Sequence, residues 1–309
     1  MNNNDGSEIP AVVSADITTI IGPYRVIENY RVQGARTMVW KVTNGSKSFI
    51  LKLYRKKRKW HPEVYAYSNW VTEYAPYAPE LITVIEHEDI QGILTSEISG
   101  VPLRQLQMPD PVKAEVFFRA GQLAGNLHRC QPGKWFGIPD SQGFPLQDCF
   151  NDPVTAMKTD FQRWFTKAID LHCLEKTEIA IGEWALDQMG VFAGERPLPI
   201  NQDYTPGNWL IDEQGNLVGV IDFECMLWGV RVNSFGLLWH RYFPQNPQLE
   251  NAFWEGYGVN PWNTDPIQVG IVCIQIGMAD IALGTEYNNE QNILSGRQMI
   301  RRMAKALSI

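Results

Sequence analysis

Residues 201–224 read NQDYTPGNWLIDEQGNLVGVIDFE, and this stretch decides the fold. Asp203 is followed five residues later by Asn208, and Asp222 closes an apolar run. An Asp, an Asn and a second Asp at this spacing are typical of the catalytic loop and metal site of phosphoryl-transfer enzymes. The stretch therefore predicts phosphoryl transfer, although an ordinary Asp-containing turn is the alternative that a short motif leaves open.

The local pattern around these residues predicts a β-hairpin. Residues 209–211 and 217–221 are apolar, and they flank a turn that contains Gly and Asn. A hairpin returns the chain on itself, so we expect Asn208 at its start to lie beside Asp222 at its end.

The residue types suit the chemistry of phosphate transfer. A hydroxyl that attacks the terminal phosphate of ATP needs a carboxylate to orient it and accept its proton, and we assign this role to Asp203. Asn208 and Asp222 offer oxygen donors, which are the ligands that Mg²⁺ prefers together with phosphate and water. Together they predict a clamp for a metal ion and a phosphate.

These motifs resemble those of the aminoglycoside phosphotransferase and choline kinase group, the phosphotransferase enzyme family, whose fold is related to that of eukaryotic protein kinases. Its members typically read His-x-Asp-x-x-x-x-Asn and then Ile-Asp-Trp/Phe-Glu, and the second motif stands here as residues 221–224, IDFE. Glu224 occupies the position of a Gly in protein kinases, which favours the small-molecule branch. The resemblance implies ATP and Mg²⁺ as cofactors and a small-molecule hydroxyl as the phosphate acceptor.

A lysine and a glutamate upstream fit the same family. Residues 48–54, SFILKLY, read as an apolar strand that Lys52 interrupts with a charge. Such a lysine either has a partner or guards an edge strand against aggregation. Residues 61–70 begin like a helix, with Pro in the first turn and Glu63 just after it. The resemblance implies that Glu63 holds Lys52 against the α- and β-phosphates, while Glu63 also complements the helix N-terminus.

Two further segments follow the family's order. Residues 30–42 read as strand, turn and strand around Gly34, where the family folds a hairpin over the phosphates, although an ordinary hairpin explains this segment equally well. Residues 92–103, GILTSEISGVPL, change from an apolar strand to Ser, Gly and Pro, which indicates a boundary. In the family this boundary is the hinge whose backbone meets adenine, and a plain linker is the alternative. The adenine-pocket candidates are Ser96, Glu97 and Ile98.

Four landmarks thus occur in the family's order along the chain. They are the turn at Gly34, Lys52 with Glu63, the hinge, and the set of Asp203, Asn208 and Asp222. Chance does not readily produce all four in this order. We therefore expect an α+β, bilobal protein kinase-like fold, with a small N-terminal antiparallel β-sheet lobe carrying one helix and a larger, mostly helical C-terminal lobe. Residues 266–277 and 291–307 read as helices of the larger lobe. The expected division is residues 1–97 for the nucleotide-binding lobe and 98–309 for the catalytic and acceptor-binding lobe.

Two positions depart from the family pattern. The His that opens the catalytic loop is replaced by Asn201, and the Asp expected after the metal motif is replaced by Asn233. In related kinases these residues brace the loop by hydrogen bonds, for which Asn has suitable donors and acceptors. We expect catalysis to survive, and a catalytically degenerate nucleotide-binding sensor or scaffold is the alternative. A protein kinase is disfavoured by Glu224 and by the lack of an Ala-Pro-Glu signature.

Charge divides unevenly at the expected hinge. Residues 1–97 carry eleven basic and eleven acidic side chains, so the net charge of −7 lies in residues 98–309, with 16 basic against 23 acidic. An acidic cleft concentrates cations, which favours an amine-bearing acceptor such as an aminoglycoside, a choline-like alcohol or an amino sugar. General solubility explains the same charge. Nucleic acid is disfavoured because its binding needs a basic surface. The basic run 55–59, RKKRK, is expected at the surface.

The remaining composition is that of a soluble enzyme. At 309 residues the chain is long enough for one large or two ordinary domains. It has no run of eighteen apolar residues and no basic-then-apolar start, so we expect no membrane partner and a cytoplasmic location. Five cysteines without a CxxC pair are expected as thiols, and His128 as a structural residue. The oligomeric state and the identity of the acceptor do not follow from the sequence.

Overall fold

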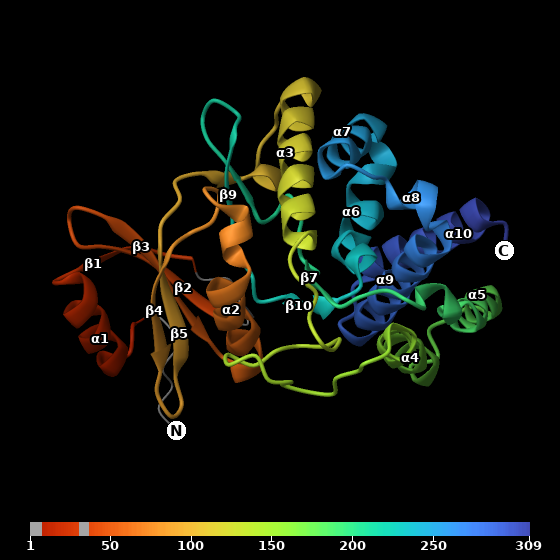
Figure 1. Ribbon diagram of the computed structural model, residues 1–309, viewed down its shortest axis with the longest axis horizontal. Helices are drawn as coiled ribbons and strands as arrows, with labels where there is room; N and C mark the ends of the chain where they lie inside the picture. The colour runs from red at the N-terminus through yellow and green to blue at the C-terminus, as the bar shows by residue number, and fades with distance from the viewer. Residues whose placement is uncertain (1–7, 31–36) are drawn as a thin grey trace.

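The computed structural model describes residues 8–30 and 37–309, so Gly34 lies outside the described residues. The strands of the first hundred residues gather at one end of the molecule, and most helices gather at the other (Figure 1). This arrangement gives the α+β, two-lobed architecture that the sequence predicts.

The small lobe is built on a five-stranded antiparallel sheet. Its strand order is β1 (Arg25–Asn29), β2 (Thr37–Thr43), β3 (Ser48–Tyr54), β5 (Gln91–Ser96) and β4 (Leu81–Glu86). Lys52 lies on β3, where it pairs with Val39 of β2 and Ile93 of β5. Because β3 is the central strand, Lys52 is not an edge-strand lysine, and its charge needs a partner within the protein.

Two helices cover the sheet, one more than the sequence predicts for this lobe. Helix α1 (Ala11–Ile21) buries Val13 and Ile17 in a cluster with Trp40 and Leu51 of the sheet. Its β-branched sequence, AVVSADITTII, has no strong helix period, which explains why the sequence pattern did not indicate it. Helix α2 (Lys57–Asn69) is the expected helix, and it starts four residues earlier than the sequence suggests.

The large lobe combines helices with short strands. Its helices are α3 (Asp110–His128), α4 (Pro153–Asp170), α5 (Lys176–Asp187), α6 (Gly236–Arg241), α7 (Pro247–Tyr257), α8 (Pro261–Thr264), α9 (Pro266–Glu286) and α10 (Glu290–Leu307). Its strands are β6 (Val101–Pro102), β7 (Leu198–Asn201), β8 (Trp209–Ile211), β9 (Leu217–Val220) and β10 (Met226–Gly229). Short 3₁₀ helices include η1 (Val71–Tyr74), η3 (Met189–Phe192) and η4 (Arg231–Ser234).

Glycines let helices α3 and α7 approach closely. A Cβ added at Gly121 would lie 2.1 Å from the carbonyl oxygen of Phe253, and one at Gly256 would lie 1.9 Å from that of Phe118. Neither contact is possible for a real side chain. The two helices therefore pack backbone to backbone.

Helix α9 is long and apolar enough to cross a membrane by length and composition, with a mean hydropathy of 1.7. However, 72% of its most apolar window is buried inside the protein. It packs closely on α10, because the two helices meet at Gly277 and Gly296. Its apolarity thus serves the core of the large lobe.

The two lobes share part of their core. Ala66 and Trp70 at the end of α2, with Tyr74 of η1, belong to the same buried cluster as Phe117 and Trp209 of the large lobe. The division at residues 97 and 98 falls in the segment between β5 and β6 and stays a prediction. By packing, the end of α2 belongs to both lobes.

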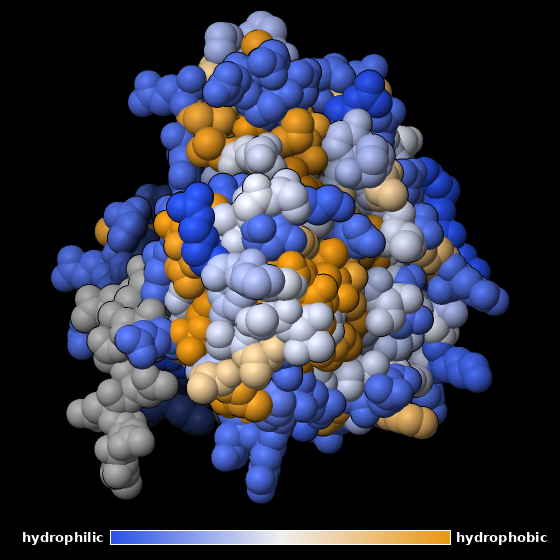
Figure 2. Space-filling model, turned by 90° about the vertical axis from the view of Figure 1, so that its left-hand side faces the viewer, coloured by the Kyte–Doolittle hydropathy of each residue, from blue (hydrophilic) through white to orange (hydrophobic). Residues whose placement is uncertain are grey.

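The outer end of the small lobe shows hydrophobic side chains in separate patches among hydrophilic ones (Figure 2), as on most protein surfaces. All five cysteines are free thiols, as the sequence predicts. His128 is a structural residue, since it hydrogen-bonds Tyr257 and Ser234, and burial lowers its pKa to about 3.

Candidate active site

The predicted catalytic loop, residues 202–208, follows β7, and two asparagines hold it. Asn201, the last residue of β7, accepts a hydrogen bond at its Oδ1 from the backbone N–H of Asp203, at 2.9 Å. Asn208 donates from Nδ2 to the backbone carbonyl of Asp203, also at 2.9 Å. The backbone of Asp203 is thereby fixed on both sides, and among the described residues no donor occupies the amide oxygen of Asn208.

The hairpin predicted from the sequence is present. Strands β8 and β9 pair antiparallel, and the backbone N–H of Ile221 donates to the carbonyl of Asn208 at 3.0 Å. In the turn, the Asp212 carboxylate accepts bonds from the N–H groups of Gln214 and Asn216. The hairpin brings Asn208 and Asp222 to the same end of the two strands, as expected.

Asp222 lies directly after the hairpin in an unusual backbone conformation. Its φ is 66°, a left-handed value that Asp and Asn adopt more readily than other non-glycine residues. The next residue, Phe223, is fully buried and stacks against Tyr74 at 5.5 Å. The buried ring anchors the chain and so holds the Asp222 carboxylate at the surface of the site.

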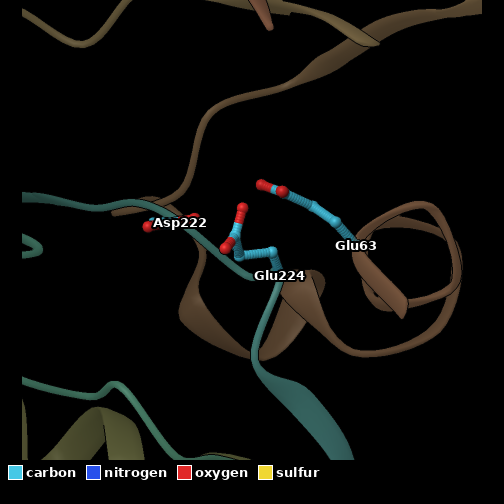
Figure 3. Close-up of side chains that lie close together, drawn as sticks. All are labelled: Glu63, Asp222 and Glu224. Atoms are coloured by element: carbon cyan, nitrogen blue, oxygen red, sulfur yellow. The ribbon is translucent and has the colours of Figure 1, made fainter. Parts of the chain in front are cut away.

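Lys52 contacts three carboxylates of this site. Its Nζ lies 2.7 Å from Glu63, 2.6 Å from Asp222 and 3.1 Å from Glu224. Glu63 reaches from α2 toward Glu224 in Figure 3, and one carboxylate oxygen from each acid lies within 4.8 Å of the others. Tyr54 also donates to Glu63. The expected Lys52–Glu63 pair is present, while its role toward phosphates stays a prediction.

Sequence reasoning did not assign Glu224 to the site, although the IDFE motif contained the signal. Glu224 also lies 3.6 Å from the Nζ of Lys59. Lys59 was expected at the surface with the rest of the run 55–59, and this expectation was wrong for that residue. Because α2 starts at Lys57, its first turn points Lys59 toward the IDFE motif, residues 221–224. Lys59 also donates a hydrogen bond to the Cys225 sulfur at 3.1 Å.

The charged groups around Lys52 shift one another's pKa values. Burial lowers the pKa of Lys52, but Asp222 and Glu63 outweigh it and raise the pKa well above its ordinary value. Burial raises the pKa of Asp222, yet the Lys52 ammonium outweighs it and lowers the pKa. The pKa of Glu63 is raised, chiefly by burial. Three carboxylates against the two ammonium groups of Lys52 and Lys59 still leave an excess of negative charge, which suits a cation.

Asp203 differs from Asp222 in its electrostatics. Burial and then the negative charge of Asp222 raise the pKa of Asp203 above its ordinary value. A carboxylate with a raised pKa holds a proton more strongly, which suits a group that accepts one from a hydroxyl. The site therefore contains one carboxylate suited to a cation and one suited to a proton.

The two departures from the family pattern behave differently. Asn201 braces the catalytic loop, as expected, but its Nδ2 is buried without a hydrogen-bond partner in the described structure. Asn233 was expected to brace the loop as well. Its Nδ2 instead donates to the Met157 sulfur at 3.4 Å, and among the described residues it makes no hydrogen bond to the loop.

The three hinge residues are not equivalent. The N–H groups of Ser96 and Glu97 donate to the carbonyls of Glu80 and Ser48, and the Glu97 carboxylate pairs with Lys41 at 2.5 Å. Among the described residues, the N–H of Ile98 has no acceptor. If the hinge meets adenine through its backbone, Ile98 carries the available donor.

Comparison with known proteins places the chain in one sequence family. The sequence model of the Phosphotransferase enzyme family matches residues 31–268, which is most of the chain and includes every candidate site residue. Among curated proteins, no sequence matches this chain.

Solved structures share the fold at low sequence identity. The aminoglycoside phosphotransferase APH(4)-Ia is 15% identical, with 95% of this chain and 97% of that one covered at a TM-score of 0.72. The gentamicin complex of APH(2")-IIa is 13% identical, with 95% and 96% covered and a TM-score of 0.64. A Haemophilus somnus 129PT protein provisionally named fructosamine-3-kinase is 11% identical, with 94% and 96% covered and a TM-score of 0.60. These matches confirm the predicted kinase-like fold.

Proposed function

Because the chain belongs to the phosphotransferase enzyme family, we propose that it transfers the γ-phosphate of ATP to a hydroxyl group of a small molecule. The observation that carries this proposal is the convergence of Lys52, Glu63 and Asp222 from both lobes on one point, with Asp203 on the adjoining loop. A thermostable mutant of APH(4)-Ia has been solved with AMP-PNP and hygromycin B, which supports nucleotide use by this fold.

The residues present fit a magnesium ion. Asp222 offers a carboxylate, and the Nδ2 of Asn208 is engaged with the loop while its oxygen has no partner in the described part of the chain. Two such oxygens completed by phosphate and water are a usual Mg²⁺ environment, and Glu224 adds a second carboxylate close to Asp222. A bound Mg²⁺ would neutralise charge on the phosphates. Asp222 and Asn208 would hold it.

Lys52 would change partners when the nucleotide enters. In the structure its ammonium lies between Asp222 and Glu63. Once Asp222 turns to a cation, Lys52 keeps Glu63 and gains the α- and β-phosphates. Glu63 is 2% exposed and is itself held by Tyr54 and by the Phe223 N–H, so it is a fixed support for this exchange.

The acceptor hydroxyl would be oriented by Asp203, which takes its proton as the bond to phosphorus forms. We infer an amine-bearing acceptor from the acidic balance of residues 98–309. The solved relatives bound to hygromycin B and gentamicin support this class.

The experiment that tests the function measures transfer of radiolabelled phosphate from γ-labelled ATP to amines, amino sugars and aminoglycosides. We expect a labelled acceptor with the wild type and none with Asp203→Asn, which retains the shape of the side chain. Equal transfer by both proteins would show that Asp203 does not orient the acceptor hydroxyl or take its proton.

One observation favours a second candidate function. Asn233 does not brace the catalytic loop, and the Asn201 amide is left without a partner, so the loop has less support than the family motif provides. A nucleotide-binding protein without catalysis is therefore the alternative. It predicts Mg²⁺-dependent ATP binding with no phosphate transfer and no ATP hydrolysis.

A further inference from the structure

A cavity of about 480 Å³ adjoins the candidate active site. Gln202, which precedes Asp203, lines it together with Glu224 and Cys225, which follow Asp222. Its other walls come from the first turns of α2, from residues 136–150, from α4, and from β10 with the residues that follow it. Its size lies within the range of small-molecule sites. A ligand in this cavity would lie beside the catalytic loop, where an acceptor has to be.

Most of the cavity wall is apolar or neutral. Phe136, Phe150, Met157, Met226 and Trp228 contribute apolar and aromatic surface. The neutral hydrogen-bonding groups on the wall come from Gln147, Gln202, Thr159 and Asn233. On such a wall, the few charged side chains decide which charged ligands are accepted.

Six charged side chains line the cavity, three of each sign. The cations are Arg58, Lys59 and Arg163, and the anions are Asp148, Asp160 and Glu224. The acidic excess of the whole lobe is therefore absent from the wall of this cavity.

Four of the six charges are already matched inside the protein. Glu224 lies 3.1 Å from Lys52 and 3.6 Å from Lys59. Asp160 lies 2.5 Å from Arg163 and also accepts a hydrogen bond from Gln275 at 2.6 Å. Arg58 and Asp148 both line the cavity and are exposed to solvent, and within the described ranges neither makes an ion pair or a side-chain hydrogen bond. One cation and one anion thus remain for a ligand.

We propose that the phosphate acceptor is a zwitterion, a hydroxylated small molecule with one ammonium and one carboxylate group. Asp148 binds the ammonium and Arg58 binds the carboxylate, since a guanidinium matches a carboxylate in geometry as well as in charge. A polycation would place several ammonium groups against Arg58, Lys59 and Arg163 with one carboxylate available, and such like-charge contacts reject a ligand. This inference rests on the proposed phosphotransferase function and specifies its substrate class.

The test compares matched acceptors that differ in one charge, by ADP release and by mass detection of the phosphorylated product. The probes are fructosylglycine, a zwitterion, and 1-amino-1-deoxyfructose, which lacks the carboxylate; L-serine and L-serinamide form a second pair. Gentamicin serves as the polycation. We expect each zwitterion to show a kcat/KM about tenfold or more above that of its cationic partner and of gentamicin.

Substitutions of Arg58 and Asp148 test the two proposed ligand contacts separately. Arg58→Gln should lower kcat/KM for the zwitterions about tenfold and leave the purely cationic probes unchanged, whereas Asp148→Asn should weaken both. Lys56→Gln is the matched control, because Lys56 is an exposed cation of the same basic run that does not line the cavity. Its kinetics should equal those of the wild type.

The outcomes are distinguishable from failure of the proposed function. A preference for gentamicin or for the cationic partners overturns the zwitterion assignment, as does an Arg58→Gln effect that is equal for all probes. No transfer to either zwitterion, with Mg²⁺-dependent ATP binding intact, overturns the assignment and leaves the nucleotide site standing. Loss of ATP binding by the wild type overturns both proposals.

Discussion

Lys52 contacts Glu63, Asp222 and Glu224 at once, so its charge supports the site before any nucleotide binds. Its side chain is 12% exposed and that of Glu63 is 2% exposed. Removing one partner of a buried ion pair leaves an uncompensated charge, which costs about 3–5 kcal/mol. The lysine is therefore expected to contribute to stability as well as to the phosphate contact proposed for it.

We expect Lys52→Met to lower the free energy of unfolding by about 3–5 kcal/mol at pH 7, measured by urea denaturation. Lys52→Arg keeps the charge and should lose less stability, while both variants lose activity. The exposed Lys47, on the loop between β2 and β3, provides a control in Lys47→Met. A loss below about 1 kcal/mol for Lys52→Met would show that the cluster does not depend on its cation.

Asp203 has the opposite relation to stability. Burial and the charge of Asp222 raise the pKa of Asp203, so the folded protein favours the protonated form of this carboxyl group. Its contribution to stability is full below the ordinary pKa of an Asp and is lost as pH rises through the raised one. At a pH above the raised pKa, the ionised Asp203 therefore destabilises the fold.

Asp203→Asn should raise the melting temperature at pH 7.5 while it abolishes turnover, and the gain should shrink toward pH 4. A gain of about 1 kcal/mol corresponds to roughly 2–4 °C in proteins of 150–250 residues, and to somewhat less in a longer chain. Calorimetry of both proteins across this pH range is the measurement. A variant that melts lower than the wild type at pH 7.5 would contradict the raised pKa.

At the scale of elements, α2 and β5 together set the position of Lys52. Trp60 of α2 donates from its indole N–H to the carbonyl of Gly92 on β5, at 3.0 Å. A Cβ added at Gly92 would lie 2.8 Å from the backbone oxygen of Lys52 and 2.4 Å from the Leu53 side chain. A residue larger than glycine at this position must therefore displace the strand that carries Lys52.

Gly92→Ala is expected to destabilise the protein by about 1–3 kcal/mol and to weaken ATP binding, because the strand shift moves the Lys52 ammonium. Gly190→Ala is the matched control, since a Cβ there meets nothing within 4 Å and it lies on η3, away from the sheet. Urea denaturation and ATP titration of both variants give the comparison. Unchanged ATP affinity in Gly92→Ala would show that nucleotide binding does not depend on the position of the strand that carries Lys52.

The sequence predicts the elements whose signals are local. Strand β3 and the β8–β9 hairpin stand where residues 48–54 and 209–221 placed them, because apolar runs bounded by turn residues need little tertiary information. Helix α1 escaped prediction because its β-branched residues become helical only by packing on the sheet. The start of α2 escaped because its first turn consists of basic residues without an apolar period.

Part of the candidate site is likewise predictable from the sequence, and part is not. The motif spacing indicates Asp203, Asn208 and Asp222, and the family resemblance implies the pair of Lys52 and Glu63. The structure brings these residues together at the junction of the lobes. The contacts of Glu224 and Lys59 could not be predicted, because they depend on how the first turn of α2 crosses the metal motif. The cavity is likewise formed by segments far apart in sequence, so its charge balance differs from that of the lobe as a whole.

At the scale of the whole molecule, the lobes meet through polar contacts and a shared core. Lys52 bonds Asp222 across the junction, and the Glu63 carboxylate accepts the Phe223 N–H at 3.3 Å. The end of α2 is buried in the core of the large lobe. A nucleotide at this junction would contact both lobes, so its binding should stabilise the whole protein rather than one part.

The most direct test of the central claim is the melting temperature with and without ATP and Mg²⁺, for the wild type and for Asp222→Asn. Asn tolerates the left-handed backbone at this position and removes only the charge. A ligand at a hundred times its Kd adds about 2.7 kcal/mol of stability, a rise of several degrees. We predict such a rise for the wild type, dependent on Mg²⁺ and absent from the variant; no rise, or an equal rise in both proteins, would contradict a nucleotide site at Asp222.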